Sequence, residues 1–466
     1  MGPRPVALSP RDLSEGDVNW SAARGSWVDQ LGDATRAMLA EDERYFIRQS
    51  LSTPCLDVVE RAHGPTLVDT DGRGILDFHG NSAHQVGYGH PKVVAAVKEA
   101  LDELPFSPRR YTNKIAIDLA RRLVELAPGE LGKVLLAPSG AAAVSIALKL
   151  ARHSTGRHKT VSMWESFHGA NLDTISVGGE ALFRQGSGPL LPGTEHVPPF
   201  RMAERFFGTD GEAFGRLADY LDYVLEVQGD VAAVVAEPVR WTTLDLPPEG
   251  FWPSVRKSCD RHGALLIFDE VPSCLGRTGK MFACENFATV PDILVIGKGL
   301  GGGVMPIAAV IARSDLDALP DGALGHYTHE KSPIGAAAAL ATLDVIEEEG
   351  LVERSRVTGA ATLEHLKALV ADSMVFSSAR GLGMSWAVEV GHVAGHRPSE
   401  LADLLLYACL QRGLSFKVGG GNVATLCPPL NIDEADLTSA LSILRDAGSA
   451  LATALGPACH AAVTSE

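Results

Sequence analysis

Two apolar stretches, ALLIFDEV at residues 264–271 and PDILVIGK at residues 291–298, decide the fold of this sequence. The first ends with Asp269 in its FDEV segment, and the second ends at Lys298. Continuous apolar runs of this length are typical of strands in a parallel sheet that is covered on both faces. Because the carboxyl ends of such strands form the ligand crevice of an open sheet, we expect both side chains to reach one site.

The second stretch continues as ILVIGKGLGGGVMPIAAVIA at residues 293–312, where Lys298 is the sole charge. Its length suits a membrane-spanning helix, but five glycines and Pro306 argue against one. We interpret it as two short buried strands, ILVIG and IAAVIA, joined by a glycine-rich loop. This places a lysine at the end of a buried strand.

Flanking segments alternate between helical and strand patterns from Ser139 to about Arg313, which predicts an α/β core with a mostly parallel sheet. The predicted elements there are helices at 140–153 and 251–263 and strands at 159–163, 231–238 and 264–271. After Pro333 we predict a smaller α+β unit, with helices at 335–350, 360–371 and from Glu434, and a strand at 384–390. The predicted organisation is residues 1–75 as an N-terminal arm and part of the small domain, 76–333 as the large domain, and 334–466 as the C-terminal small domain. Within the first part, polar residues 1–40 are expected to form the arm.

Composition excludes several classes of protein. The 466 residues are 45% hydrophobic, so a chain dominated by disorder is excluded. A formal charge of −16, from 57 acidic and 41 basic side chains, disfavours binding to nucleic acid or to anionic membranes. Seven cysteines, none in a CxxC pair, indicate neither a disulfide framework nor a metal site, and a cytoplasmic location fits best.

Asp269 and Lys298 have two interpretations. A desolvated lysine amine is a nucleophile that can form a Schiff base, and a buried carboxylate needs a cationic partner such as a protonated pyridine nitrogen. Alternatively, the two residues form an ion pair that supports the crevice. On these two residues alone the alternatives are about equal.

Two further segments favour cofactor chemistry. Ser139 and Gly140 lie where a strand turns into a helix, and backbone N–H groups at a helix start bind phosphate, although a plain helix cap would look the same. Phe167 and His168 follow another strand, where an aromatic ring can stack on a heterocycle or pack in the core. A Schiff-base lysine, a pyridinium carboxylate, a phosphate-binding turn and a stacking ring are together what pyridoxal phosphate requires.

These residues, in this order, resemble the class III aminotransferase group of fold-type I pyridoxal-phosphate enzymes, from about residue 45 to 445. The motifs that carry the resemblance are DGRGILDFHGNSAHQVGYGHP (71–91), SGAAAVSIALKLAR (139–152), SFHG (166–169), AEP (236–238), FDEV with GRTGKMFACE (268–285), PDILVIGKGLGGGVMP (291–306), THEKSP (328–333) and CPPL (427–430).

The resemblance implies a role for each matching residue. Lys298 corresponds to the Schiff-base lysine, Asp269 to the partner of the ring nitrogen, and Phe167 to the stacking residue. Further cofactor contacts are implied at Ser139, Gly140, Ala141, His168, Val271 and Thr328. The threonine at position 328 reaches the phosphate from the neighbouring subunit in the family, which implies a homodimer with shared active sites. No metal site is expected.

The sequence departs from the family at residues that handle a second substrate. An arginine that binds the α-carboxylate is replaced by Thr425, and a glutamate that neutralises this arginine is replaced by Thr242. Pro272 stands in place of a glutamine near the cofactor ring, and SGAAA replaces the usual SGTEA. Losing an arginine–carboxylate pair weakens the prediction of a transaminase.

Cationic residues occur elsewhere on the expected substrate side. Arg109, Arg110 and Tyr111 lie in PFSPRRYTN, and paired arginines suit a phosphate or phosphonate group, although one of them could instead pair with Asp102 or Glu103 at the surface. His84 lies on the family's active-site loop, where a structural histidine is favoured somewhat over a catalytic one.

Within the group, several segments look most like the lyase branch. This implies elimination of ammonia from a small, anionic amino-phosphonate such as (R)-1-hydroxy-2-aminoethylphosphonate, to give phosphonoacetaldehyde. The alternative is a class III aminotransferase that uses a keto-acid acceptor.

Overall fold

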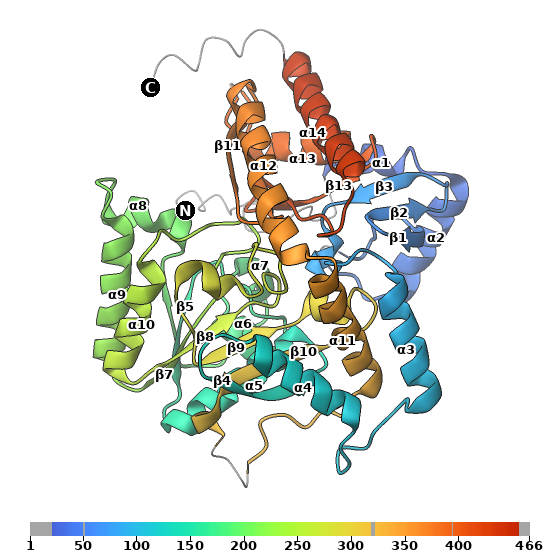
Figure 1. Cartoon of the computed structure of the whole chain (residues 1–466). Helices are drawn as coiled ribbons and strands as arrows, with labels where there is room; N and C mark the ends of the chain where they lie inside the picture. Colours follow the sequence, from blue (N-terminus) through green and yellow to red (C-terminus); the bar gives the residue numbers. More distant parts are fainter. Residues whose placement is uncertain (1–20, 50–51, 318–321, 394, 456–466) are drawn as a thin grey trace. The chain divides into compact units, whose positions relative to one another are not determined.

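The computed structural model describes residues 21–49, 52–317, 322–393 and 395–455 (Figure 1). The chain divides into two compact units. The large unit contains residues 81–241 and 245–356, and the small unit contains the described residues up to Gly80, residues 242–244 and those from Val357 onward. Every residue predicted to bind cofactor or substrate belongs to the large unit.

A seven-stranded sheet with the order β4-β10-β9-β8-β7-β5-β6 forms the centre of the large unit. β10 runs antiparallel to β4 and β9, whereas the other neighbouring strands are parallel. The strands are β4 (Leu131–Ala137), β5 (Lys159–Met163), β6 (Thr194–Val197), β7 (Val231–Ala236), β8 (Leu265–Asp269), β9 (Ile293–Ile296) and β10 (Ala308–Arg313). The mostly parallel sheet is therefore confirmed, and residues 293–312 contain two strands joined by a glycine-rich turn, as predicted.

Helix α5 (Gly140–Thr155) packs across this sheet and contacts β4, β7, β8, β9 and β10. It begins at Ser139, whose Oγ accepts a hydrogen bond from Ala142 N at 3.2 Å, and it ends at Gly156, where φ is 66°. A polar N-cap and a left-handed glycine are common helix boundaries. Because β4 and β9 run in the same direction, the start of α5 lies at the edge where β8 and β9 end.

The remaining helices of the large unit surround this layer, and α9 and α10 lie side by side (Figure 1). These helices are α3 (Pro91–Glu103), α4 (Lys114–Leu126), α6 (Leu172–Val177), α7 (Ala181–Arg184), α8 (Ala203–Phe207), α9 (Ala213–Gln228), α10 (Phe251–His262) and α11 (Pro333–Glu348), with α12 (Leu351–Ala371) continuing into the small unit.

The small unit contains two four-stranded sheets, ordered β1-β2-β3-β13 and β11-β12-β15-β14. Helix α13 contacts β12, β13, β14 and β15 as well as α1 and α14. The elements are α1 (Ala22–Val28), α2 (Asp33–Tyr45), β1 (Val59–His63), β2 (Thr66–Asp69), β3 (Gly74–Asp77), β11 (Phe376–Gly381), β12 (Trp386–Val390), α13 (Pro398–Leu410), β13 (Leu414–Ser415), β14 (Lys417–Gly419), β15 (Val423–Leu426) and α14 (Glu434–Leu455).

The structure differs from the prediction at the N-terminus and near the end of the large unit. Within the expected arm, residues 22–28 form α1 and residues 33–40 belong to α2. Trp27 of α1 is buried, and its Nε1 donates to Leu56 O at 3.0 Å. Residues 1–20 lie outside the described part of the chain. The large unit extends to Arg356 rather than to residue 333, because α11 packs on α3 and α4.

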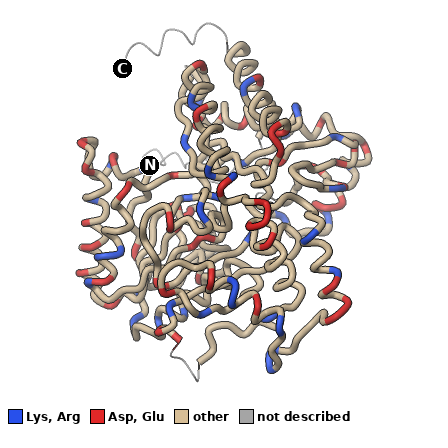
Figure 2. Tube along the Cα trace, in the orientation of Figure 1, with Lys and Arg blue, Asp and Glu red and all other residues tan. Residues whose placement is uncertain are grey.

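The distribution of charged residues and the hydropathy of the helices are as follows. Acidic and basic residues are interspersed along the chain rather than separated by sign (Figure 2). Among the described residues, no helix combines the length and apolar character needed to span a bilayer.

Candidate active site

Lys298 lies just beyond β9, at the carboxyl end of the central sheet. It begins a short 3-10 turn, Lys298–Gly301, with a φ of 44°. A side chain other than glycine rarely adopts this left-handed conformation, and such strain is typical of functional sites. Lys298 is exposed, whereas Gly297, Gly299 and Leu300 on either side of it are buried. The prediction of a buried lysine is therefore wrong for the side chain, although the turn that carries it is buried.

Close packing on both sides holds this turn. A Cβ added to Gly297 would lie 3.2 Å from Ala308 Cβ and 3.4 Å from Val271 Cγ1. A Cβ added to Gly299 would lie 1.8 Å from Gln85 Oε1, so the Gln85 carboxamide rests directly on this glycine. Gln85 is fully buried, and its amide makes no hydrogen bond with the described residues. The conformation of Lys298 therefore depends on small residues at 297 and 299.

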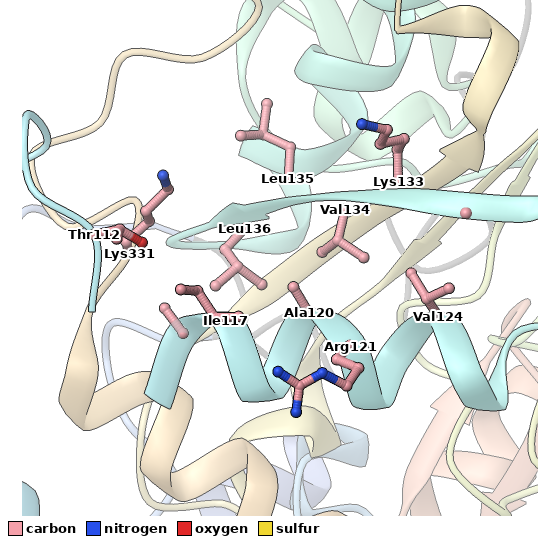
Figure 3. Close-up of a pocket in the computed structure, with 12 residues that line it drawn as sticks. Thr112, Ile117, Ala120, Arg121, Val124, Lys133, Val134, Leu135, Leu136 and Lys331 are labelled. Carbon is pink, nitrogen blue, oxygen red and sulfur yellow. The ribbon is translucent and has the colours of Figure 1, made fainter. Parts of the chain in front are cut away.

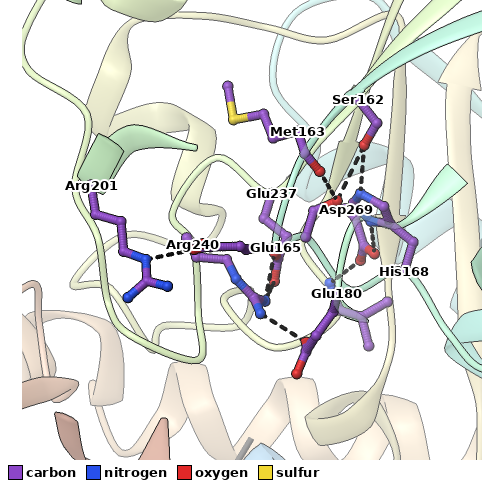
Figure 4. A network of polar contacts seen from close by, with 11 residues as sticks. Ser162, Met163, Glu165, His168, Glu180, Arg201, Glu237, Arg240 and Asp269 are labelled. Atoms are coloured by element: carbon purple, nitrogen blue, oxygen red, sulfur yellow. Dashed lines mark hydrogen bonds and ion pairs between the residues drawn. The ribbon is translucent and has the colours of Figure 1, made fainter. Parts of the chain in front are cut away.

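Asp269 ends β8, the strand next to β9, and is buried. Its Oδ1 accepts a hydrogen bond from Val271 N at 3.1 Å. Its Oδ2 lies 2.9 Å from Nδ1 of the buried His168, which donates because an ionised carboxylate can only accept. His168 Nε2 is 3.4 Å from Ser162 Oγ (Figure 4). The carboxylate is thus held in place and keeps acceptor capacity for a further cation.

Phe167 precedes His168 and is half-buried. Its ring packs against Phe183 of α7, with 4.5 Å between the ring centroids and an interplanar angle of 42°. Phe167 is adjacent to His168, which contacts Asp269. This position is compatible with the predicted role of Phe167 as a stacking surface.

The turn before α5 lies against the same residues. A Cβ added to Gly140 would lie 3.0 Å from Val271 Cγ1, the side chain that also packs on Gly297. A Cβ added to Gly169 would lie 2.5 Å from Ala141 Cβ, so the turn also abuts the SFHG segment. The structure thus brings the residues of four separate motifs together at one edge of the sheet.

This arrangement fits pyridoxal phosphate. The N-terminus of the 16-residue helix α5 presents unpaired backbone N–H groups that suit a phosphate. Asp269 offers a buried carboxylate for a ring nitrogen, Lys298 offers an amine, and Phe167 offers a flat apolar surface. Within the described residues no cluster of His, Cys, Asp and Glu is suited to hold a metal ion.

Glu270, next to Asp269, has an unusual environment. It is fully buried, and its carboxylate accepts hydrogen bonds from Ala283 N at 2.5 Å and from Cys284 N at 2.7 Å. Burial raises the pKa of Glu270 to about 7 despite these two bonds. The residue holds the start of the 283–287 turn against the end of β8.

Sequence reasoning missed a buried ionic group beside these residues. Arg240 lies between Glu180 and Glu237, and Nη2 and Nη1 are each 2.9 Å from the nearest carboxylate oxygen (Figure 4). Glu180 and Arg240 are 60 positions apart, so no local pattern announces this contact. An arginine just after the buried strand β7 was the only available signal.

The predicted substrate-side residues form a separate, exposed group. Arg109, Arg110 and Tyr111 are exposed, and Arg109 Nη2 lies 2.6 Å from His326 Nε2. The ring of Phe106 contacts that of His329 with 5.2 Å between centroids. These residues therefore lie beside the segment that contains the exposed Thr328.

His84 is buried, with its ring 5.2 Å from that of Tyr88. The loop that carries it has left-handed backbone at Asn81 and Ser82, and Trp241 Nε1 donates to Ser82 Oγ at 2.9 Å. This loop also supplies Gln85, so its position affects the turn at Lys298.

Thr425 and Thr242 contact each other in the small unit. Both are buried, and Thr425 Oγ1 donates to Thr242 O at 2.8 Å. The two positions at which we expect a departure from the family thus hold neutral residues that are joined by a hydrogen bond.

The fold and site define a fold-type I pyridoxal-phosphate enzyme. The class III aminotransferase family profile matches residues 48–447, and the chain belongs to this family. It is 45% identical over 461 residues to (R)-1-hydroxy-2-aminoethylphosphonate ammonia-lyase of Vibrio splendidus, covering 95% of this chain and 96% of the relative. It is 33% identical to an alanine/serine racemase of Pyrococcus horikoshii, covering 88% and 89% of the two chains.

Solved structures agree with this assignment. An amine transaminase from an uncultivated Pseudomonas species, with pyridoxal phosphate bound, superposes with a TM-score of 0.79 and 28% identity, covering 84% of this chain and 95% of the other. The cofactor of the chain is pyridoxal phosphate, as the sequence predicts. The family contains enzymes of different reaction types, so family membership does not by itself decide the reaction.

The packing at Gly299 predicts a compensating pair of substitutions. Gly299→Ala places a Cβ inside the Gln85 carboxamide and should destabilise the protein by about 1–3 kcal/mol, as overpacking does, and weaken retention of the cofactor. Gly299→Ala combined with Gln85→Ala removes the overlap and should recover most of both losses. Thermal unfolding and the visible absorbance of bound cofactor measure the two effects. Equal losses in the single and double variants would contradict this packing.

The raised pKa of Glu270 predicts a pH-dependent stability. A carboxyl whose pKa is higher in the folded than in the unfolded state stabilises the fold most below its ordinary pKa of 4.5, and this contribution is lost as the pH rises toward about 7. Glu270→Gln should therefore flatten the dependence of unfolding free energy on pH between about 4.5 and 7 in the cofactor-free protein. Urea unfolding at a series of pH values tests this, and an unchanged slope would show that other groups titrate there.

Proposed function

We propose that the protein is an ammonia-lyase that acts on a small amino-phosphonate such as (R)-1-hydroxy-2-aminoethylphosphonate and releases phosphonoacetaldehyde and ammonia. The observation that carries this proposal is the Thr425–Thr242 pair. A neutral hydrogen-bonded pair offers no cation for the carboxylate of a keto-acid acceptor, and an elimination needs no acceptor. The 45% identity to an enzyme of this name over 95% of the chain supports it.

The chain's own residues would divide the work as follows. Asp269 holds a proton on the ring nitrogen of the cofactor, and His168 fixes the orientation of Asp269. Lys298 binds the cofactor at rest and, once released, takes the proton from the amine-bearing carbon of the substrate. When bound, pyridoxal phosphate supplies the electron sink that makes this proton acidic. Loss of the neighbouring hydroxyl as water, followed by hydrolysis, gives phosphonoacetaldehyde and ammonia.

The cofactor phosphate would bind at the start of α5, with Ser139, Gly140 and Ala141, and the ring would lie between Phe167 and Val271. The substrate phosphonate would be bound by Arg109 or Arg110, with Tyr111 and His84 as further substrate contacts. Arginine suits this group because its planar fork matches the oxygens of phosphonate.

The second part of the proposal is a homodimer in which Thr328 reaches the phosphate of the neighbouring subunit. Apolar side chains are exposed along residues 101–117, among them Leu101, Phe106 and Ile117. An apolar groove of about 480 Å³ runs between α4 and β4, with Thr112 and Lys331 at one end (Figure 3). Exposed apolar surface next to the Thr328 segment supports a second copy of the chain as its occupant.

The alternative function is a class III aminotransferase with an arginine supplied from elsewhere in the chain. The match to the aminotransferase family supports this alternative.

A cytoplasmic location is proposed because the six cysteines of the described residues are all free thiols.

Stoichiometry separates the two reactions. Purified protein with bound cofactor, supplied with (R)-1-hydroxy-2-aminoethylphosphonate and no keto acid, should release many equivalents of ammonia per subunit. Lys298→Ala should lower the rate by at least about 10²–10⁴-fold, because the proton acceptor is lost. A single equivalent of product, followed by arrest until a keto acid is added, would identify an aminotransferase.

Substitution of the arginines tests the phosphonate site. Arg109→Ala or Arg110→Ala should raise the KM for the phosphonate about 10–100-fold, the range expected for losing a charge-assisted contact, and change the KM of a neutral amine little. His326→Ala is the matched control, because it removes the contact with Arg109 but leaves both cations. Equal effects on charged and neutral substrates would assign the arginines to structure.

A substitution in the groove between α4 and β4 tests whether this surface forms the dimer interface. Ile117→Glu places a charge on the apolar surface and should weaken association at least about tenfold, with a parallel loss of cofactor affinity. Val227→Glu on α9 is the control, since Val227 is also exposed but lies on another helix. Sedimentation velocity measures the oligomeric state, and an unchanged dimer in Ile117→Glu would move the interface elsewhere.

A further inference from the structure

Arg240 connects two segments that approach the cofactor site from different strands. Its Nη1 donates to Glu237 Oε2 and its Nη2 to Glu180 Oε2, both at 2.9 Å. The exposed fractions of the three residues are 9%, 6% and 7%. Charges this deeply buried must be paired, so the position of each segment depends on the other.

Glu237 fixes one end of this connection to the sheet. It directly follows β7, which is hydrogen-bonded along its length to β8, the strand that ends at Asp269. Arg240 is itself held by backbone hydrogen bonds with Asp245 at 3.1 and 3.2 Å. The positions of Glu237 and Arg240 are therefore coupled to β8, the strand that ends at Asp269.

Glu180 fixes the other end to the aromatic segment. Gly179 N and Glu180 N both donate to Ser166 O, at 2.9 and 3.2 Å. A Cβ on Gly179 would lie 2.4 Å from Met163 O, so the two backbones are in close contact. Ser166 is followed directly by Phe167 and His168, and Glu180 therefore moves with these two side chains.

We propose that Arg240 is a positioning residue for the cofactor ring: through Glu180 it holds Phe167 and His168 at a fixed place relative to Asp269 at the end of β8. The proposal rests on the proposed function, in which the cofactor ring would lie between Phe167 and Val271. Both terminal nitrogens of Arg240 already donate to carboxylates, which favours this role over binding of the substrate anion.

Glu180→Ala is the most informative variant. Replacing Arg240 would leave two buried carboxylates side by side, whereas Glu180→Ala leaves Arg240 paired with Glu237 and breaks only the connection to the aromatic segment. Glu180→Gln keeps the acceptor oxygen and the side-chain length, and serves as the conservative rescue. Glu165→Ala is the matched control, because it removes the half-exposed pair with Arg201 from the same aromatic segment (Figure 4).

The measurements are the dissociation constant of pyridoxal phosphate from the cofactor-free protein, the visible circular dichroism of the bound cofactor, and thermal unfolding without cofactor. Glu180→Ala should raise the dissociation constant about tenfold or more and reduce the dichroism, while Glu180→Gln and Glu165→Ala stay close to the unmodified protein.

Three results would overturn the proposal. A lower unfolding temperature with unchanged cofactor affinity and dichroism would mean that the group is only structural. A lower KM for the phosphonate with unchanged dichroism would mean that Glu180 restrains an arginine that binds substrate. Equal losses of cofactor affinity and dichroism in Glu165→Ala would mean that any substitution in the aromatic segment weakens cofactor binding, whether or not it breaks the contact with Arg240. The dissociation constant of the cofactor, its dichroism and the unfolding temperature do not depend on the reaction catalysed, so failure of the proposed lyase activity remains distinguishable.

Discussion

The left-handed backbone at Lys298 is the constraint on which the site depends. A residue with φ of 44° is held only where its neighbours permit no alternative. A Cβ at Gly297 would be crowded by Val271 and Ala308, and a Cβ at Gly299 would overlap the Gln85 carboxamide unless that side chain moved. Val271 in turn packs on Gly140 at the start of α5. The turn at Lys298 and the turn before α5 therefore pack against one side chain, so a shift in either would disturb the other.

Buried charged groups connect Asp269 to more distant parts of the large unit. Asp269 is buried at the end of β8 and needs partners, which it finds in His168 and in the backbone of Val271. His168 belongs to the same segment as Ser166, whose carbonyl accepts backbone hydrogen bonds from Gly179 N and Glu180 N. Glu180 is buried as well and is paired with Arg240. Each of these buried charged groups thus depends on its neighbour for a partner. The last of them, Glu237, pairs with Arg240 and directly follows strand β7 of the central sheet.

The sequence allowed the strands of the central sheet to be predicted because their signals are local. Runs such as ILVI and LLIF are unbroken by charge, and their ends coincide with β9 and β8 to within a few residues. Contacts between distant residues had no such signal: Arg240 with Glu180, Arg109 with His326, and Gln85 on Gly299 are all pairs separated by 60 positions or more. Polar helices α1 and α2 were missed because a few buried residues, such as Trp27, anchor segments whose composition resembles an exposed arm.

The neutral pair at Thr425 and Thr242 has a physical rationale under the proposed elimination. An arginine that alternately binds a substrate carboxylate and a glutamate must be desolvated in both states, which is costly unless each partner is placed well. An elimination returns the cofactor to its starting form, so the site meets a single anion and never a second. The Thr425 hydroxyl donates to the backbone carbonyl of Thr242 at 2.8 Å, which satisfies this buried side chain without any charge. Under the proposed function the cation would come from exposed arginines such as Arg109 and Arg110, where desolvation costs less.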